Sequence, residues 1–430
     1  MPFTHHRLAL VMALAISAFS IECAQARGDI PITPFVFDPL PELNDDWSYP
    51  PPERAPSLDG YLIRQATTHN GRQVAHVLEP ALNRLLETGA LTASETTELE
   101  KFGEDLADRP GGIGAALEQL AGSQNANLAS ATSAAAGKVS QQLLSTLRTL
   151  PTDNDGHVWV QGLGDNGKLD KQGGSDGLKY GTKGLMLGAD WSLDHAWRIG
   201  VMGAKSTSQF DAQRFSAELD SWHLGGYAVR QDGPLALRMG ATYSSHAGQN
   251  KRSVNLLEYR EQLKGSYNAQ SQAVFSELGY QLGSEDVQVE PFAGLGFQRY
   301  HRDSFKETGG VAALNVGSQT QQNLSSTVGL RLASVYRLDN RMSLTPHVST
   351  SWKHLYGEVG SQVRQSYRAA PGYIEGFTIT GTSLDRNSLD VQGGLDLALS
   401  TEHTVGLTYS AQVGTHSRNQ GLMGQWRMSF

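Results

Sequence analysis

Between residues 156 and 430, apolar and polar residues alternate over many short segments. In Trp197-Arg198-Ile199-Gly200-Val201 the apolar residues hold the odd positions, and Leu235 to Tyr243 follow the same rule. A period of two places successive side chains on opposite faces of a strand. Twelve alternating segments can be counted, the first near 156–164 and the last at 422–430. The pattern predicts a large antiparallel sheet with one apolar face and one face rich in glycine, serine and charge.

The predicted connections between these strands fall into a short and a long class. The strands of a soluble β-sandwich would also alternate. Short turns at one end of the strands and long polar loops at the other, together with a hydrophilic second face, favour a barrel whose outer surface contacts lipid. The short turns are 192–196, 232–233, 283–286, 339–340 and 400–403. The long polar loops are 165–180, 210–218, 248–263, 303–319 and 356–387.

The region before the barrel, 58–110, has helical periodicity instead. Apolar residues from Val74 to Leu86 follow the i, i+3, i+4 rule, and Thr92 with Glu95 forms a capping box for a second helix. A third helical stretch runs from Ile113 to about Leu150. Its middle contains only small or polar residues, so it is too narrow and polar for a core helix.

We expect 111–155 to be a linker helix that spans the pore, because a barrel of twelve strands has room for about one helix. A disordered Ala/Ser linker is the alternative. Eight charged positions alternate with outward apolar residues and should face the lumen, because at the middle of the lipid face an arginine or lysine would cost about 2–4 kcal/mol and a carboxylate somewhat less. We expect these side chains to contact the linker helix and hold it in the pore. A hydrated pore without specific helix contacts is the alternative. These positions are Arg198, Arg238, Glu277, Glu290, Arg331, Lys353, Asp390 and Asp396.

The amino-terminal region predicts export from the cytoplasm. Residues 1–26 combine a basic start, an apolar core and an Ala24-Gln25-Ala26 cleavage site, as in a signal peptide. Eight prolines in 27–57 predict an extended arm. Cys23 is the only cysteine, and it lies within the leader. The net charge of −8 argues against nucleic acid as a partner.

No known catalytic motif is present in the sequence. There is no G-x-S-x-G nucleophile motif, and none of the thirteen histidines has H-E-x-x-H spacing. We therefore expect no catalytic residues, no cofactor site and no metal site, and a protein that is not an enzyme.

At this point the chain resembles the translocator unit of classical (type Va) autotransporters across roughly residues 60–430. The matching stretches are 116–122, 159–162, 184–191, 197–200, 279–280, 290–295, 329–331 and 426–430. The resemblance implies an all-β transmembrane barrel of twelve antiparallel strands at 156–430, with the last helix of an N-terminal α-helical segment threaded through the pore. It also implies an outer-membrane location and type V secretion, in which the barrel exports or displays its upstream segment. An exported segment would be exposed at the cell surface.

The resemblance further implies partners. Outer-membrane lipid would surround a monomeric barrel, periplasmic chaperones would escort it, and the barrel-assembly machinery would recognise the last strand. The residues of that strand that would form the insertion signal are Leu422, Trp426, Met428 and Phe430.

The sequence departs from the family upstream of the barrel, where 27–110 is too short for a long β-helical or enzymatic passenger. We expect the arm 27–57 to be a rudimentary passenger; a passenger that has been lost or shortened is the alternative. A surface adhesin that binds through loops 303–319 and 356–387, and a small porin, are the alternative functions. Cleavage of the linker by asparagine cyclisation is a further hypothesis. It would use Asn125 or Asn127, with Glu277 or Glu290 as the acid, although the family's cleavage motif is not present.

Overall fold

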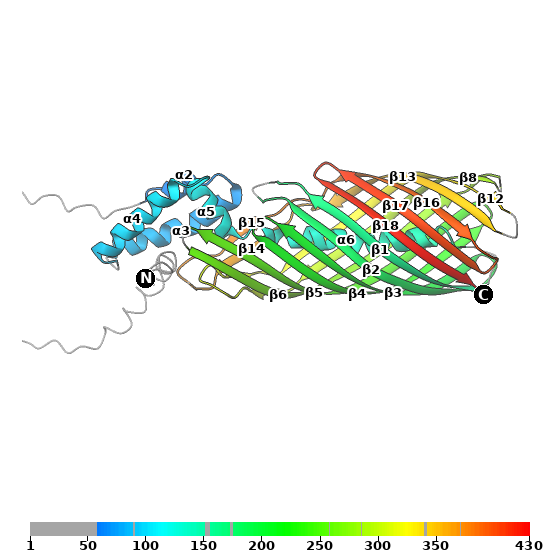
Figure 1. Cartoon of the computed structure of the whole chain (residues 1–430), viewed down its shortest axis with the longest axis horizontal. Coiled ribbons are helices and arrows are strands. Elements are labelled where there is room, and N and C mark those ends of the chain that lie inside the picture. Colours follow the sequence, from blue (N-terminus) through cyan, green and yellow to red (C-terminus); the bar gives the residue numbers. More distant parts are fainter. Residues whose placement is uncertain are drawn as a thin grey trace, which may run out of the picture.

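The computed structural model describes residues 58–88, 91–150, 155–172, 175–257, 259–284, 286–338, 342–369 and 371–430. The predicted signal peptide, 1–26, and the proline-rich arm, 27–57, lie outside the described residues. In the described part, a cluster of helices stands at one end of a long barrel, and one further helix runs inside the barrel (Figure 1).

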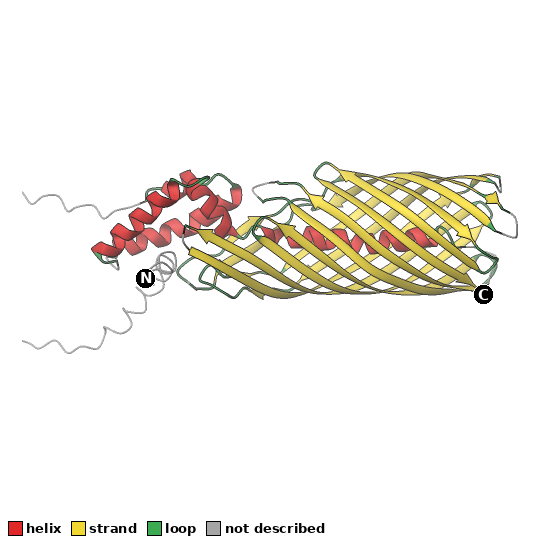
Figure 2. Cartoon of the chain, in the orientation of Figure 1, coloured by secondary structure: helices red, strands yellow, loops and turns green. Residues whose placement is uncertain are grey.

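Four helices form the cluster, which we call the helical module: α2 (Tyr61–Gln65), α3 (His69–Glu87), α4 (Ala93–Ala107) and α5 (Gly112–Ala121). The predicted capping box at the start of α4 is confirmed. The Thr92 side chain accepts a hydrogen bond from the Glu95 amide, and the Glu95 carboxylate accepts one from the Thr92 amide. The fifth helix, α6 (Gln124–Leu147), lies along the axis of the barrel (Figure 2).

The sheet consists of twelve antiparallel strands and closes on itself, as predicted. The first strand pairs with the last, and β8 pairs with β11, so the path of neighbours has no free edge. The strands are β1 (Gly156–Leu169), β2 (Leu178–Ser192), β3 (Trp197–Ala212), β4 (Phe215–Asp232), β5 (Leu235–Leu256), β6 (Tyr259–Tyr280), β8 (Val287–Arg302), β11 (Gln319–Ser334), β13 (Ser343–Gly357), β16 (Asn387–Ala398), β17 (His403–Gly414) and β18 (Ser417–Ser429). Short additions to this sheet are β7 (Leu282–Gly283) and β12 (Tyr336–Arg337).

The two faces of the sheet differ in exposure as the alternation predicts. Outward apolar side chains are exposed in the isolated chain, for example Leu185 at 52% and Leu224 at 67%. Inward polar side chains such as Gln161 and Arg238 are buried. Within the described residues, no helix is both long enough and apolar enough to cross a membrane.

Two connections predicted to be long polar loops, 210–218 and 248–263, are instead continued strands with tight turns. Strands β3 and β4 pair as far as Ala212 and Phe215, and β5 and β6 pair as far as Leu256 and Tyr259. The prediction was wrong because the strand ends continue to alternate, and their inward positions hold apolar residues that pack under the helical module. The buried residues are Phe210, Phe215, Leu219, Val254, Leu256, Tyr259 and Leu263.

Of the other three predicted loops, 165–180 is shorter than expected, because β1 continues to Leu169 and β2 begins at Leu178. The remaining two, 303–319 and 356–387, contain a second sheet at the same end of the barrel. Its four strands are β9 (Phe305–Lys306), β10 (Leu314–Val316), β14 (Gln362–Tyr367) and β15 (Phe377–Thr380), in the order β15-β14-β10-β9. Leu314 and Ile379 of this small sheet share one apolar core with Leu117 and Leu120 of α5. We call this end of the barrel the module end and the opposite end the turn end.

The single linker helix predicted from Ile113 to about Leu150 is two helices. Gly122 has φ +57°, a left-handed conformation that ends α5, and α6 begins two residues later. Only glycine adopts this conformation readily, and a Cβ at this position would also overlap the Leu314 side chain. The break lets α5 stay in the helical module while α6 enters the barrel.

Inward glycines make room for aromatic rings on neighbouring strands. The Tyr227 ring lies over Gly200, where a Cβ would overlap it, and its hydroxyl donates to Asp190 at 3.0 Å and accepts from Trp159 Nε1 at 2.8 Å. Replacing Gly200 would therefore displace a hydrogen-bonded ring from the barrel wall.

We expect Gly200→Val to destabilise the folded barrel by about 1–3 kcal/mol, the usual cost of overpacking. The midpoint of thermal unfolding of the purified barrel, followed by its heat-dependent gel mobility, measures this. Gly203→Val is the matched control on the same strand, because the nearest atom to a new Cβ there is 3.9 Å away. Equal midpoints for the two variants would contradict the role given to the Tyr227 ring.

Candidate functional site: the helix-filled pore

The helix α6 fills the module half of the barrel with small side chains. Alanine favours a helix and occupies little width, and the interspersed Asn, Ser and Thr can bond to the polar lumen. Side chains from Asn125 to Thr132 have no exposed surface. This fit explains why the sequence from Gly122 to Gly137 contains so few large residues.

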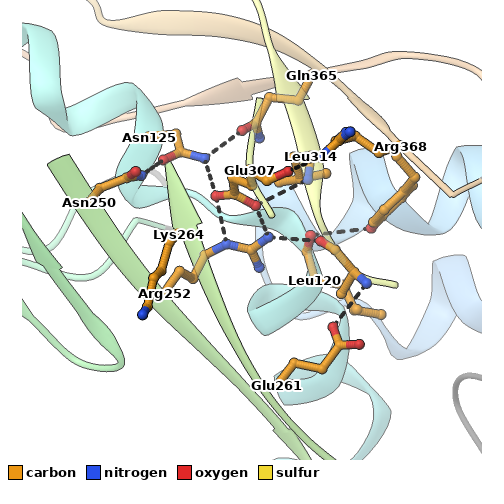
Figure 3. Close-up of polar contacts among 12 residues, drawn as sticks. Leu120, Asn125, Asn250, Arg252, Glu261, Lys264, Glu307, Leu314, Gln365 and Arg368 are labelled. Carbon is orange, nitrogen blue, oxygen red and sulfur yellow. Dashed lines mark hydrogen bonds and ion pairs between the residues drawn. The ribbon is translucent and has the colours of Figure 1, made fainter. Parts of the chain in front are cut away.

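At the module end, side chains from four separate segments meet around the start of α6 (Figure 3). We call this set the rim cluster: Asn125, Asn250, Arg252, Glu307 and Gln365. The Asn125 amide nitrogen donates to Gln365 at 2.9 Å and to Glu307 at 3.2 Å, and its oxygen accepts from Asn250 at 3.0 Å. Arg252 pairs with Glu307 at 2.6 Å.

The rim cluster also binds the backbone of the α5–α6 junction. Arg252 donates to the Gln119 carbonyl at 3.0 Å, and Gln365 donates to the Ala121 carbonyl at 2.8 Å. Arg302 adds a hydrogen bond of 2.9 Å to the Asn125 carbonyl. Asn125, Arg252 and Glu307 are almost completely buried, so the start of α6 is held by satisfied polar contacts.

Towards the turn end, one side of α6 is apolar and packs against the wall formed by β1 to β4. Val139, Leu143 and Leu147 contact a cluster that includes Trp159 and Met202. The opposite side of α6 faces a cavity of about 240 Å³. Its lining combines polar side chains, among them Lys138, Lys353 and Asp390, with apolar ones such as Leu144 and Phe275. The helix therefore packs tightly on one side of the lumen and leaves an open space on the other.

Four charged residues of the barrel wall surround Arg148, the C-cap of α6. Together with Arg148 we call them the base cluster: Arg148, Arg238, Glu277, Glu290 and Arg331. Glu277 accepts two hydrogen bonds from Arg148, one of them from Nε at 3.0 Å. Arg238 and Arg331 pair with Glu290 at 2.6 Å and 2.9 Å, and with Glu277 at 3.3 Å and 3.5 Å. Arg148 and Arg331 also lie over the Phe292 ring, 4.9 Å and 5.0 Å from its centre.

The remaining predicted lumen residues are placed as follows. Asp390 accepts a hydrogen bond of 2.7 Å from Gln141 of α6. Lys353 lines the cavity beside α6. Arg198 pairs with Asp190 at 2.8 Å on the neighbouring strand, and Asp396 faces His347 at 3.6 Å. The structure thus brings Arg238, Glu277, Glu290 and Arg331 together, and places Arg198 and Asp396 in separate pairs.

The predicted insertion residues share the outer face of β18 or extend it. Leu422 and Phe430 are more than half exposed, and the Trp426 ring stacks on His403 with centres 5.8 Å apart. Met428 lies on the same face, partly exposed. The Phe430 amide and carbonyl both bond to Gly156, at 3.0 and 3.1 Å, where β18 meets β1. Their role as an insertion signal stays a prediction.

A closed barrel with a lipid-facing exterior and a helix in its lumen defines a class of outer-membrane proteins. The model of the autotransporter β-domain family matches residues 158–410. The chain belongs to this family. Its barrel is a translocator of the bacterial outer membrane, and a translocator barrel is not a catalytic domain.

Known proteins agree with this assignment. An extracellular serine protease of Serratia marcescens is 30% identical over 287 residues, which cover 66% of this chain and 27% of the protease. The chain thus spans about a quarter of the length of the curated relatives it matches. The translocator domain of the autotransporter NalP from Neisseria meningitidis matches with a TM-score of 0.56 and 17% identity, over 70% of this chain and 98% of that domain. The β domain of the Bordetella autotransporter BrkA matches with a TM-score of 0.47 and 15% identity, over 64% of this chain and 100% of that one.

The match to the family model favours a translocator over the adhesin and the porin that the sequence left open.

The structure also bears on the cleavage hypothesis. Glu277 contacts the end of α6 at Arg148, whereas Asn125 lies at its start, and a helix of this length measures about 36 Å. Asn127 lies in the same first turn, so neither Glu277 nor its neighbour Glu290 can act on either asparagine, and the acids selected from the sequence were wrong.

Sequence reasoning did not identify the rim cluster. Glu307 and Gln365 lie in long connections, where alternation gives no information. Asn250 and Arg252 could have been found, because they share the inward parity of Arg238 on β5. Asp190, which pairs with Arg198, was missed although it has the inward parity of β2.

We expect Glu277→Gln to destabilise the folded barrel by about 3–5 kcal/mol, because it leaves three buried guanidinium groups with one carboxylate. The helix end should also loosen, which raises the ion conductance of the purified barrel in a planar bilayer. Asp170→Asn is the control: it breaks an exposed ion pair with Lys168 and should leave both the unfolding midpoint and the conductance unchanged. An unchanged unfolding midpoint and conductance for Glu277→Gln would refute the role of the base cluster.

A second carboxylate, Glu118, lies at the junction of α5 and α6 on the module end. It accepts hydrogen bonds from Thr68 of the module and, at 2.6 Å, from Ser123. Burial raises the pKa of Glu118 above its ordinary value, although both hydrogen bonds oppose this. A carboxyl group with a raised pKa in the folded state stabilises that state most below its ordinary pKa, and the contribution is lost as the pH rises through the folded-state pKa.

The docked helical module should therefore be more resistant to proteolysis in mild acid than at neutral pH. Glu118→Gln is neutral at every pH and should flatten this dependence. Limited proteolysis by an enzyme active across the whole pH range measures it, with Glu100→Gln on the exposed face of α4 as the control. The same pH dependence in Glu118→Gln and the parent would exclude Glu118 as its origin.

Proposed function

We propose that this translocator displays the helical module at the cell surface and keeps α6 in its pore as a permanent plug. The observation that carries the proposal is the continuous docking of the module, the small sheet and α6 at one end of the barrel. The two helices α3 and α5 contact the loops of the barrel, and α6 continues directly from α5 into the lumen.

Specific hydrogen bonds support a fixed docking. The Asn70 side chain donates to the Thr380 carbonyl at 2.8 Å and accepts from the Thr380 amide at 2.9 Å. The Asn70 side chain therefore makes the two hydrogen bonds to the β15 backbone that a neighbouring strand would make. Gln119 of α5 accepts from the Asn255 amide at 2.9 Å at the end of β5. Asn70 is fully buried, so this contact excludes water.

The proposed orientation follows from the lengths of the connections. Outer-membrane barrels have short turns on the periplasmic side and long loops outside. The turn end, where β18 meets β1, would then face the periplasm, and the module end would face the surroundings of the cell.

The remaining parts of the chain complete the proposal. Residues 1–26 would direct export, 27–57 would be a rudimentary passenger, 58–110 the displayed helical segment and 111–155 the linker that leads into the barrel at 156–430. Periplasmic chaperones and the barrel-assembly machinery, which would read Leu422 to Phe430, are the proposed partners. The protein would have no enzymatic activity of its own.

Labelling of single cysteines on intact cells tests this proposal. Glu100→Cys on α4 should react with a membrane-impermeant maleimide, because this exposed position would lie outside the cell. Glu402→Cys, also exposed and located in the turn between β16 and β17, should react only after the outer membrane is permeabilised. Cys23, the only native cysteine, would be removed with the leader.

Labelling of Glu402→Cys alone on intact cells would reverse the orientation and refute display. The plug is tested separately by deletion of 124–147, which should raise the conductance of the purified barrel several-fold. An unchanged conductance would show that α6 does not close the pore.

A further inference from the structure

On the outer face of the barrel, two lysines and a tryptophan gather where the apolar belt ends. They are Lys183 on β2, Lys205 on β3 and Trp222 on β4. Directly towards the turn end, the outward positions of the same strands are apolar and exposed: Leu185, Leu187, Val201 and Leu224 are 52%, 54%, 55% and 67% exposed. The three residues therefore occupy the border between the hydrocarbon and the polar layer on the module side.

The strand register brings these residues next to one another. Lys205 is directly opposite Leu185 on one side and Trp222 on the other. Its ammonium nitrogen lies 5.2 Å from the centre of the Trp222 ring. Lys183 is opposite Thr207, two residues along β3 from Lys205, so the two lysines are diagonal neighbours within about 7–8 Å at their backbones.

Neither ammonium group is neutralised by the protein. Among the residues that the structure describes, no carboxylate lies within ion-pair distance of Lys183 or Lys205. The nearest acid in the register, Asp220, instead accepts a hydrogen bond of 2.8 Å from Thr207. By contrast, Lys168 on the neighbouring strand β1, farther towards the module end, is paired with Asp170 at 2.9 Å.

Two adjacent free cations beside an apolar surface match one kind of partner. Lysine ammonium groups bind phosphate oxygens through charge-assisted hydrogen bonds. Tryptophan is favoured at the level of lipid headgroups, and apolar strands accommodate acyl chains. A soluble anion would use the cations but leave the apolar part of the surface without a function.

We propose that Lys183, Lys205 and Trp222 form a binding site for a phosphorylated glycolipid of the outer leaflet. The two lysines bind the phosphate groups, Trp222 contacts the headgroup, and the acyl chains lie along Leu185, Leu187 and Val201. The inference goes beyond the proposed display function and shares only its orientation. Binding to the purified protein does not depend on that orientation, so the two proposals can fail separately.

The test measures the lipid retained by the folded full-length chain in detergent. The probes are bis-phosphorylated lipid A, the same lipid without its phosphates, and inorganic phosphate as a competitor. The variant Lys183→Gln/Lys205→Gln removes two outward charges at the site. The matched control, Lys251→Gln/Lys264→Gln, removes two outward charges that are opposite each other on the projecting part of β5 and β6.

We expect the site variant to retain at least fivefold less bis-phosphorylated lipid A than the parent, and the control variant to retain as much as the parent. Heat-dependent gel mobility verifies that both variants are folded. Equal retention by the site variant and the parent would overturn the proposal, as would an equal loss in both variants. Equal retention of the dephosphorylated lipid would exclude phosphate recognition, and full displacement by millimolar inorganic phosphate would indicate a simple anion site instead of a lipid site.

Discussion

The structure depends on the pairing of the first barrel strand with the last. Inside a bilayer no water is present to bond to a free strand edge, so every backbone amide and carbonyl must find a partner within the protein. The pairing of β1 with β18 meets this requirement along the whole length of β1, and two hydrogen bonds between Gly156 and Phe430 complete it at the turn end. Without this contact the other strands would form an open sheet with two unsatisfied edges.

Closure creates a lumen that must itself be filled. The strands supply inward polar groups and aromatic rings over glycines, but these do not span the space alone. The helix α6 fills the rest, and its two sides meet two kinds of wall. One side contacts Trp159 and Met202, whereas the other side faces the cavity that Lys353 and Asp390 help to line. This asymmetry favours one rotation of the helix about its own axis, since turning it would withdraw Leu143 from its apolar contacts with the wall.

Much of this fold could be predicted from the sequence because the alternation is a local property of each strand. The number of strands follows from it, whereas closure and the helix in the pore also needed the polar second face, the unequal connections, the small side chains of α6 and the family resemblance. The continued strands around Phe215 and Leu256 could not be predicted as reliably, since polar outward residues there resemble loop residues. The parity rule identified Arg238, Glu277, Glu290 and Arg331 as inward, but it gives no information about which inward charges meet.

Contacts between distant loops are the part that local patterns cannot supply. Asn125, Glu307 and Gln365 are far apart in the sequence, and nothing near each residue indicates the others. The break at Gly122 was missed for a similar reason. A glycine within a polar, alanine-rich stretch is compatible with a continuous helix, and only the packing of Leu314 against it shows why the chain turns there.

The two clusters at the ends of α6 differ in what they require before they can form. Four of the five base-cluster residues lie on the neighbouring strands β5, β6, β8 and β11, so the pairing of these strands alone brings Arg238, Glu290 and Arg331 together. Arg148 joins them from the end of the helix. The rim cluster instead needs α6, β5 and both long connections at once. Asn125 of α6 bonds to Asn250 of β5 and to one residue of each long connection. The rim cluster can therefore form only after the helix start has reached the module end. The base cluster specifies where the helix stops in the lumen, and the rim cluster then holds the helical module against the barrel.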